Sequence, residues 1–299
     1  MFATLPLQPR NVLMRAAERL LARHIAGWRV VFVYDGDCVK LAPGQVELAA
    51  RFQVAPQIHV DDYTFRFLCR TFGGNAAVAY AHYMADGRVS AEKIRSLVTA
   101  HMAVDATGHH IASPLRMLDV SAGYGSSARH LKHLFPGVAL RVLDAHRNAE
   151  AFNRDILGLD AGSFSLDPGS VNAAAQYDVV SALSLFAHLP RAAQGPWLAK
   201  LMQCVRPGGI LIFTAHGETA HRLHLSHLAV DPDGFGFEPV PEQFDGAIVS
   251  GGLAYGRAVT YRSFVTALVR AHSDFTEIDM RPDYWWGHQD AYVLRKAGG

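Results

Sequence analysis

The sequence contains few cysteines, almost no net charge and no long uncharged apolar run. It has only three cysteines, Cys38, Cys69 and Cys204, in none of the short spacings of a zinc knuckle or a redox motif. Such scattered cysteines, odd in number, favour a reduced, cytoplasmic setting. The formal net charge is +1, so we expect neither nucleic acid nor a membrane surface as a partner. No run of about 18 uncharged apolar residues is present, so no membrane-spanning helix is expected.

Half of the 299 residues are apolar. This is sufficient for one large hydrophobic core and a smaller one, so one or two domains are expected. Segment 11–25 combines leucines and alanines with arginines, which predicts an amphipathic helix and not a signal peptide.

Residues 1–108 predict a mostly helical N-terminal domain. Residues 28–34 are β-branched and aromatic, and the turn at 35–37 and the segment Cys38–Leu41 follow, which indicates a hairpin. Breaks at Gly73-Gly74 and Asp86-Gly87 separate the later helices, which are expected at Gln45–Phe52, Asp61–Phe72, Asn75–Met84 and Ser90–Val104. No motif here carries chemistry, so acceptor binding and oligomerisation, as in a homodimer, are the roles left open.

From Pro114 onward, strands alternate with helices. The expected strands are Arg116–Val120, Ala139–Leu143, Ser163–Leu166, Tyr177–Leu183, Ile210–Thr214, Phe275–Met280 and Ala291–Arg295. Helices are expected between them, at Ser126–Leu134, 147–157 and Arg191–Val205. This alternation implies a parallel sheet with right-handed crossovers. Residues 109–299 therefore predict an α/β domain.

A loop that suits a nucleotide-like ligand follows the first of these strands. Gly123 and Gly125 lie between a strand and a helix, where the main chain can approach a ligand without a Cβ in the way. Asp144 ends the next strand, about 20 residues further on, where a carboxylate can accept hydrogen bonds from ribose hydroxyls. The spacing Gly123-x-Gly125-x-x-Ala128 fits a dinucleotide as well as S-adenosylmethionine (SAM), so the loop alone leaves both cofactors open.

The residues around the loop resemble class I SAM-dependent methyltransferases. Asp119-x-Ser121-x-Gly123-x-Gly125 matches their Asp-x-Gly-x-Gly-x-Gly loop, with Ser121 in place of the first glycine. The loop is therefore the first of four motifs that carry the resemblance.

Three further motifs follow in the order of that family. Tyr177–Leu183 is similar to its fourth strand, and Val205–Gly209 is similar to the turn before its fifth strand. The chain also closes on a strand, as it would if a last antiparallel strand were inserted beside the sixth. The resemblance covers residues 110–299 and implies a Rossmann-like seven-stranded sheet with helices on both faces.

The resemblance implies SAM as the cofactor and assigns residues to each part of it. The methionine end is expected beside Asp119, Ser121, Ala122, Gly123 and Gly125, the ribose beside Asp144 and Ala145, the adenine near Asp167, and the cofactor's other side along Ser181 and Ala182. For Asp167, the alternative is a turn former before Pro168.

A narrower likeness concerns the acceptor. Tyr255-Gly256, Phe213–Gly217 and Trp286–Arg295 are similar to a bacterial subgroup of these methyltransferases that often accompanies glycosyltransferases or biosynthetic clusters. This likeness implies a small-molecule acceptor, such as a sugar or a natural product.

Three histidines are the candidate catalytic residues. Methyl transfer from a sulfonium mainly needs alignment and exclusion of water, whereas an alcohol acceptor also needs a base, usually histidine near neutral pH. Ligands of open α/β sheets lie beyond the carboxyl ends of the strands. His216 follows the fifth strand, His188 follows the fourth and His288 precedes the last. We rank His216 first, with a loop or capping role as the alternative for each.

Aromatic residues suggest where the acceptor binds. Residues 215–262 form a long excursion between the fifth and sixth strands, which we interpret as a lid or acceptor-binding flap. Its candidate contacts are Phe235, Phe237 and Tyr255, and Trp285 and Trp286 are candidates for an acceptor wall beside His288. Packing in the core is the alternative for all five.

No metal is expected. His216, His221, His224 and His227 cluster after the fifth strand, but nothing nearby completes a zinc set. Mg²⁺, which some methyltransferases bind, prefers oxygen ligands. A solvated or acceptor-facing helix is the expected role of this cluster.

The sequence therefore predicts a SAM-dependent methyltransferase that acts on an oxygen, in preference to a nitrogen, of a small molecule. A NAD-dependent oxidoreductase and a non-catalytic SAM-fold binding module are the alternatives. A nucleic-acid methyltransferase is not expected, because the chain has neither a basic excess nor an Asn/Asp-Pro-Pro-Tyr motif after the fourth strand.

Overall fold

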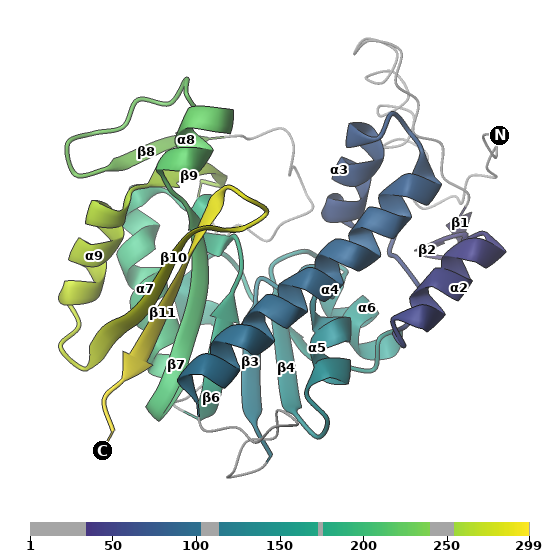
Figure 1. Ribbon diagram of the computed structural model, residues 1–299, viewed down its shortest axis with the longest axis horizontal. Coiled ribbons are helices and arrows are strands. Elements are labelled where there is room, and N and C mark those ends of the chain that lie inside the picture. The colour runs from purple at the N-terminus through teal and green to yellow at the C-terminus, as the bar shows by residue number, and fades with distance from the viewer. Residues whose placement is uncertain (1–33, 103–113, 173–175, 240–253, 299) are drawn as a thin grey trace. The chain divides into compact units, whose positions relative to one another are not determined.

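The computed structural model describes residues 34–102, 114–172, 176–239 and 254–298 (Figure 1). The chain divides into two compact units, Met1–Val89 and Ser90–Gly299, each with its own hydrophobic core. The helix expected at 11–25 and the strand expected at 28–33 lie outside the described residues. The first unit ends before residue 108 because its last helix continues into the second unit.

Unit 1 combines a short hairpin with helices around a small core. Strands β1 (Tyr34–Asp35) and β2 (Cys38–Val39) pair across the expected turn. Helices α2 (Pro43–Arg51) and α3 (Tyr63–Thr71) follow close to their expected bounds. The core contains mainly aromatic and small apolar side chains, namely Val39, Ala49, Ile58, Phe65, Cys69, Ala79, Tyr80, Tyr83 and Met84.

One helix, α4 (Ala76–His101), stands where the sequence predicts two. The predicted break at Asp86-Gly87 is wrong. A glycine inside a helix costs only about 1 kcal/mol relative to alanine, whereas a second helix would have to be nucleated anew. Met84 before this point and Ala91 after it are both fully buried. Packing on both sides therefore favours a continuous helix.

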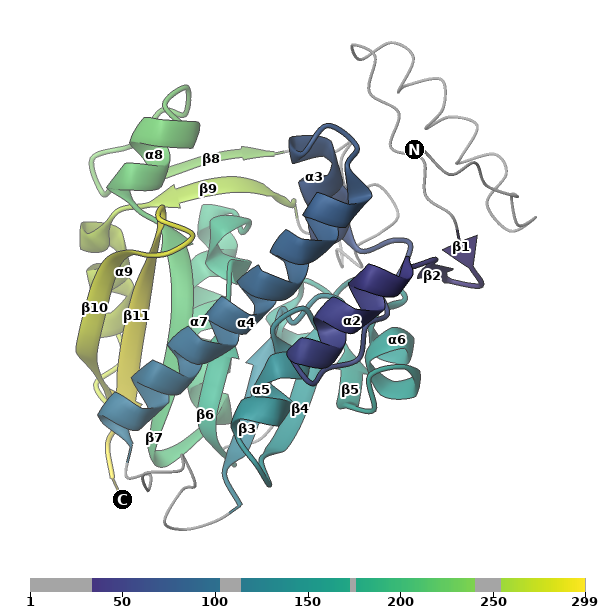
Figure 2. The same cartoon turned by 45° about the vertical axis from the view of Figure 1, so that its right-hand side comes forward.

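Unit 2 is built on a seven-stranded sheet in the order β10-β11-β7-β6-β3-β4-β5. The strands are β3 (Arg116–Val120), β4 (Ala139–Asp144), β5 (Asp160–Ser163), β6 (Tyr177–Ala182), β7 (Val205–His216), β10 (Phe275–Trp285) and β11 (Gln289–Lys296). The first five pair in parallel with their neighbours, and β11 runs antiparallel between β7 and β10 (Figure 2). This order confirms the Rossmann-like methyltransferase sheet that the sequence predicts.

Alternate strand residues face two cores, one on each side of the sheet. Met117 and Ile212 pack in the core that includes residues of α4 and α5 (Ala128–Leu134). Leu118 and Phe213, one position further along the same strands, pack in the core that includes residues of α7 (Arg191–Cys204) and α9 (Arg262–Arg270). The two-residue period of the strands produces this division. Helices therefore cover both faces, as predicted.

The third and fifth strands differ from their expected bounds. β5 ends at Ser163, where the sequence predicts that the strand begins, because Ser163 pairs with Asp144 at the end of β4. The apolar Phe164 that suggested a strand is buried just beyond it. β7 begins before Ile210, at Val205, because its pairing with β6 is interrupted by a bulge.

The excursion between β7 and β10 is mostly ordered structure. It contains α8 (Glu218–His224) and an antiparallel pair formed by β8 (Phe235–Pro239) and β9 (Gly256–Thr260), followed by α9. Residues 240–253 lie outside the described part.

The remaining short elements are α6 (Ala149–Asp155), η2 (Pro168–Ser170) and η3 (Leu185–Ala187). None of the helices in the described part is long and apolar enough to cross a membrane.

We expect Gly209→Ala to destabilise unit 2. A Cβ at this position in the β7 bulge would lie 2.8 Å from the carbonyl oxygen of Asp178 on β6. The strands would have to move apart, at a cost of roughly 1–3 kcal/mol in the free energy of unfolding. Gly44→Ala in α2 is the control, because its Cβ meets nothing within 4 Å and alanine favours a helix by about 0.5–1 kcal/mol. Urea denaturation measures both, and equal effects would contradict the close approach.

Candidate cofactor and acceptor site

The loop after β3 presents a polar surface at the carboxyl edge of the sheet. Asp119 and Val120 are buried at the end of the strand, and the next three residues, Ser121, Ala122 and Gly123, are half-buried. A Cβ on Gly123 would meet nothing within 4 Å, and its φ is +56°. The main chain here therefore borders open space, as expected where a ligand approaches the backbone.

Asp144, at the end of β4, is tied to this loop. One of its carboxylate oxygens accepts a hydrogen bond from the backbone N–H of Gly123 at 2.6 Å. The other accepts from the backbone N–H of His146 at 2.8 Å, and His146 Nδ1 lies 2.6 Å from the same oxygen. Burial raises the pKa of Asp144, but the His146 charge and these hydrogen bonds lower it more, so the net pKa lies below its ordinary value. The carboxylate is therefore ionised and oriented.

Asp119 is a buried acid of the opposite kind. Its Oδ1 accepts a hydrogen bond from the Ser181 hydroxyl of β6 at 2.7 Å. Burial raises the pKa of Asp119, the Ser181 hydrogen bond lowers it, and the nearby Asp144 charge raises it, with a net pKa of about 7. Within the described part of the chain, Oδ2 of Asp119 accepts no hydrogen bond. A cation bound here would restore the ionised form.

Gly125 is required for close packing of the loop against α6. It has a φ of +72°, and its Cβ would lie 2.5 Å from Oδ1 of Asn153 and 2.6 Å from Cδ1 of Leu157. Asn153 also donates to the carbonyl oxygen of Gly123 at 2.9 Å. Gly125 thus lets α6 support the loop, and its contact with the cofactor stays a prediction.

Backbone strain is concentrated around the carboxyl edge of unit 2. In the described ranges, five residues other than glycine have positive φ: Gln53, Ser121, Ser184, Asp283 and Trp286. Ser121 follows β3 and Ser184 follows β6, whereas Asp283 lies in the irregular last part of β10 and Trp286 lies in the turn before β11. The left-handed conformation costs roughly 1–2 kcal/mol for a residue with a Cβ, and such strain is typical of functional sites.

His216 lies at the end of β7 in a polar network. Its Nδ1 lies 3.1 Å from the carbonyl oxygen of Ala258 and therefore carries the proton. Its Nε2 lies 3.2 Å from the side-chain nitrogen of Gln289 and accepts from it. Gln289 also bonds the hydroxyls of Thr214 and Ser184. Both ring nitrogens of His216 are thus engaged.

Burial makes this imidazole a weak base. Burial and the nearby His188 lower the pKa of His216, the Ala258 hydrogen bond opposes them, and the resulting pKa is about 3. A general base works best when its pKa lies near the working pH. This environment does not favour His216 as the general base, and its catalytic role stays a prediction.

His188 is enclosed by the segment that leads into β9. Its Nδ1 donates to the carbonyl oxygen of Gly256 at 2.8 Å, and the Gly256 N–H donates back to the His188 carbonyl at 3.1 Å. The Tyr255 ring stacks on the imidazole, with centroids 4.8 Å apart. Burial lowers the pKa of His188 to about 4. Tyr255 and His188 therefore form one wall of the carboxyl edge.

His288 lies in the turn between β10 and β11, next to the end of β7. Its ring centroid is 5.7 Å from that of His216 and 5.0 Å from that of His224 on α8. The ring is half-buried, and burial lowers its pKa. The structure thus brings His188, His216 and His288 together along one edge, where the sequence places them only by strand order.

Several predicted acceptor contacts are core residues. Trp285 is 1% exposed, and its indole N–H donates to the Ser90 hydroxyl on α4. Phe235 is buried against Phe264 of α9, and Phe237 packs beside it. Trp285 and Phe235 fill the interior, as the packing alternative describes. Phe237 is half-buried, and its contact with an acceptor stays a prediction. Trp286, in contrast, is 45% exposed.

The remaining predicted cofactor residues lie at the ends of their strands. Ala145 is buried after β4, and Ala182 is buried at the end of β6. Asp167 is exposed and accepts a hydrogen bond from the Gly169 N–H at 2.9 Å, which caps the η2 turn. The capping role predicted as the alternative for Asp167 is thus present, and its contact with adenine stays a prediction.

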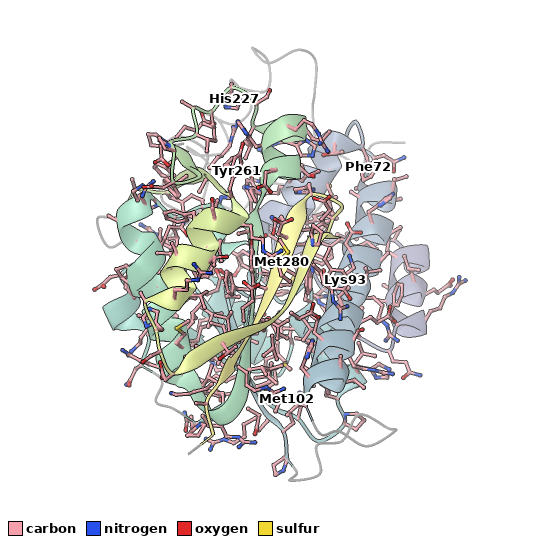
Figure 3. The ribbon with its side chains drawn as sticks, turned by 60° about the vertical axis from the view of Figure 1, so that its left-hand side comes forward. Phe72, Lys93, Met102, His227, Tyr261 and Met280 are labelled. Carbon is pink, nitrogen blue, oxygen red and sulfur yellow. The ribbon has the colours of Figure 1, made fainter. Side chains whose placement is uncertain are left out.

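The histidines of and after α8 do not converge on a metal. His221 bonds Tyr261 at 2.7 Å, and His227 pairs with Glu238 at 3.0 Å, so these side chains lie apart at the outer end of the unit (Figure 3). The described ranges contain no group of three or more histidine, cysteine, aspartate or glutamate side chains that could hold a metal ion.

Three residues of the site were missed by the sequence reasoning. His146 was visible as the second residue after Asp144, but no pattern marks it as the partner of that carboxylate. Ser184 and Gln289 are 105 positions apart and meet through a hydrogen bond of 3.0 Å. Only the antiparallel placement of β11 beside β7 brings them together, so no local signal identifies them.

Several solved methyltransferases are similar to this chain in structure. A SAM-dependent methyltransferase from Clostridium acetobutylicum is 12% identical with a TM-score of 0.49, covering 72% of this chain and 93% of that one. The glycopeptide N-methyltransferase MtfA is 15% identical with a TM-score of 0.48, covering 70% and 90%. The methyltransferase CcbJ from Streptomyces caelestis is 16% identical with a TM-score of 0.47, covering 71% and 90%.

This likeness concerns the fold alone. The sequence matches no family model, and no curated protein matches it either.

We expect Asp119→Asn to stabilise the protein at pH 8. The folded-state pKa of about 7 lies above the ordinary value of 3.8, so the protonated side chain stabilises the folded state fully only below about pH 4. As the pH rises to about 7, the free energy of unfolding falls by an amount on the order of a few kcal/mol, because the unfolded chain ionises first. Thermal denaturation should show a higher Tm for the variant at pH 8 and a smaller difference at pH 5.5. A Tm difference between the variant and the wild-type protein that is the same at both pH values would contradict the raised pKa.

Proposed function

We propose that this chain is a SAM-dependent methyltransferase that acts on a small molecule. The observation that carries the proposal is the antiparallel strand β11 between β7 and β10, together with the acids that end β3 and β4. A dinucleotide-binding Rossmann sheet has six parallel strands and no such insertion. The two acids and the loop between them supply the polar groups that SAM requires.

The residues at the carboxyl edge fit the parts of SAM. The ionised Asp144 can accept hydrogen bonds from ribose hydroxyls. Asp119 is a buried acid without a cationic partner in the described residues, and the α-ammonium group of the methionine end would supply one. Ser121 and Gly123 border the same open space. When bound, SAM supplies an activated methyl group, and the protein's part is to align the acceptor and exclude water.

The excursion after β7 is proposed as the cover of the acceptor site. Its strand β9 contacts the carboxyl edge through the hydrogen bonds of Gly256 with His188 and of Ala258 with His216. These contacts, with the stacked ring of Tyr255, close one side of the site and exclude water from it.

For residues 1–108 we propose a role in acceptor binding or in oligomerisation.

An oxygen atom is the proposed methyl acceptor, in preference to nitrogen. The site includes the half-buried imidazole of His288, whose Nδ1 faces the Trp286 carbonyl and whose Nε2 has no hydrogen-bond partner among the described residues. Such a group can accept a proton from a hydroxyl. The non-catalytic alternative gains no support from the loop, because Ser121, Ala122 and Gly123 place no bulky or charged side chain there.

We expect the chain to bind S-adenosylhomocysteine, the product form of the cofactor, and not NAD. Asp144→Asn should weaken this binding roughly 10- to 100-fold, because hydrogen bonds to a charged group are lost. Asp160→Asn on β5 is the matched control, since this acid is 62% exposed. The affinity of the wild-type protein for S-adenosylhomocysteine should also rise from pH 5.5 to 8 as Asp119 ionises. Isothermal titration calorimetry measures the binding of both ligands, the effects of the two variants and the pH dependence.

Binding of NAD in place of S-adenosylhomocysteine would overturn the proposed function in favour of an oxidoreductase. Equal losses in Asp144→Asn and Asp160→Asn would remove Asp144 from the cofactor site.

A further inference from the structure

The turn that joins β10 to β11 places two neighbouring tryptophans in opposite environments. Trp285 is buried. Lys93 of α4, labelled in Figure 3, donates to the carbonyl oxygen of the preceding Tyr284, and its ammonium lies 5.7 Å from the centroid of the Trp285 ring. Trp286 is 45% exposed. The base of the turn is thus fixed to the core, and its tip presents an indole to the solvent.

The tip adopts a conformation that its sequence does not favour. The His288 N–H donates to the Trp285 carbonyl at 3.1 Å, so Trp286 and Gly287 are the two central residues of a β-turn. Both have positive φ, at +50° and +71°. Turns of this kind favour Asn-Gly, and a bulky residue at the first position is a genuine outlier. A tryptophan in this place, exposed beside a candidate active site, indicates a role in binding.

The same turn fixes the tautomer of His288. Its Nδ1 lies 3.0 Å from the carbonyl oxygen of Trp286, so Nδ1 carries the proton and Nε2 keeps the lone pair. Among the described residues, Nε2 has no hydrogen-bond partner. His288 therefore differs from His216, whose two nitrogens are both engaged.

The groups that face His288 keep its basicity low. They are His216 on β7, His224 on α8 and Asp283 on β10. Burial and His224 lower the pKa of His288, and the Trp286 hydrogen bond and the Asp283 charge oppose this. A base weaker than ordinary histidine suits a phenol, whose hydroxyl is far more acidic than that of an alcohol. An exposed indole suits the flat face of the same kind of molecule.

We propose that the β10–β11 turn is the acceptor-recognition element and that the acceptor is a neutral aromatic ring with a hydroxyl group. Trp286 stacks on the ring, and Nε2 of His288 takes the hydroxyl proton. The oxygen lone pair forms the new O–C bond, the C–S bond pair returns to the sulfonium sulfur, and the proton passes from His288 to water. This inference rests on the proposed function.

The binding test uses 2-naphthol, a flat neutral phenol, titrated into the complex with S-adenosylhomocysteine. Decahydro-2-naphthol, with the same two-ring skeleton but no flat face, is the ligand control. Trp286→Asn should weaken 2-naphthol binding by roughly 10-fold or more, whereas Trp286→Phe should retain it within about 3-fold. Because asparagine suits the turn, Trp286→Asn should also raise Tm by roughly 2–4 °C, so a loss of binding is not a loss of folding.

The catalytic test measures methyl transfer from SAM to 2-naphthol. His288→Gln should lower kcat roughly 10²-fold with unchanged 2-naphthol affinity, and it should remove the acidic limb of the pH–rate profile. His227→Gln, an exposed histidine paired with Glu238, is the matched control and should change neither quantity.

The outcomes separate this inference from the proposed function. If wild-type protein binds S-adenosylhomocysteine but not 2-naphthol, or binds both ring compounds equally, the aromatic acceptor is wrong. If Trp286→Asn binds 2-naphthol as wild type does, the turn is not the platform. Absence of methyl transfer to 2-naphthol, or full turnover in His288→Gln, would overturn the role of His288. Failure to bind S-adenosylhomocysteine at all would instead overturn the proposed function.

Discussion

The antiparallel pairing of β11 with β7 is the constraint on which the candidate site depends. In a sheet of parallel strands, only carboxyl ends meet at the ligand-binding edge. Because β11 runs the other way, its first residue, Gln289, pairs with the last residue of β7, His216. The turn before β11 therefore lies at the same edge as the loop after β3. One strand direction thus adds Gln289, His288 and Trp286 to the residues at the ends of the parallel strands.

The site combines two kinds of unfavourable interaction that the rest of unit 2 stabilises. Asp119 is a buried acid with a raised pKa, and Ser121, Ser184 and Trp286 occupy left-handed backbone conformations. The two cores on the faces of the sheet hold the strand ends in place despite these costs. Such strain at one edge is typical of a surface shaped for ligands, since the left-handed conformation is unfavourable for residues with a Cβ.

Much of the fold could be predicted from local patterns, and the exceptions have identifiable causes. The strands were correctly located where apolar residues run between turns, and β5 was displaced because Phe164 is buried beyond the strand end. The helix α4 was divided in the prediction because Asp86-Gly87 is a local break that packing overrides. In the site, Asp119 and Asp144 were found because each ends a strand in a known spacing. The burial of Trp285 and Phe235 could not be predicted, because the exposure of a side chain depends on how the whole chain packs.

The sequence by itself determined the order of strands and helices, the loop after the first strand and the acids that flank it. These features depend on residues close together in the chain, where periodicity and spacing are informative. The tertiary structure alone decided which histidine has a nitrogen available. Strand order places both His216 and His288 at the carboxyl edge. The Ala258 carbonyl and the Gln289 side chain engage the two ring nitrogens of His216, whereas the Trp286 carbonyl engages only Nδ1 of His288. These partners come from β9, β11 and a strained turn, and only folding brings them to one edge.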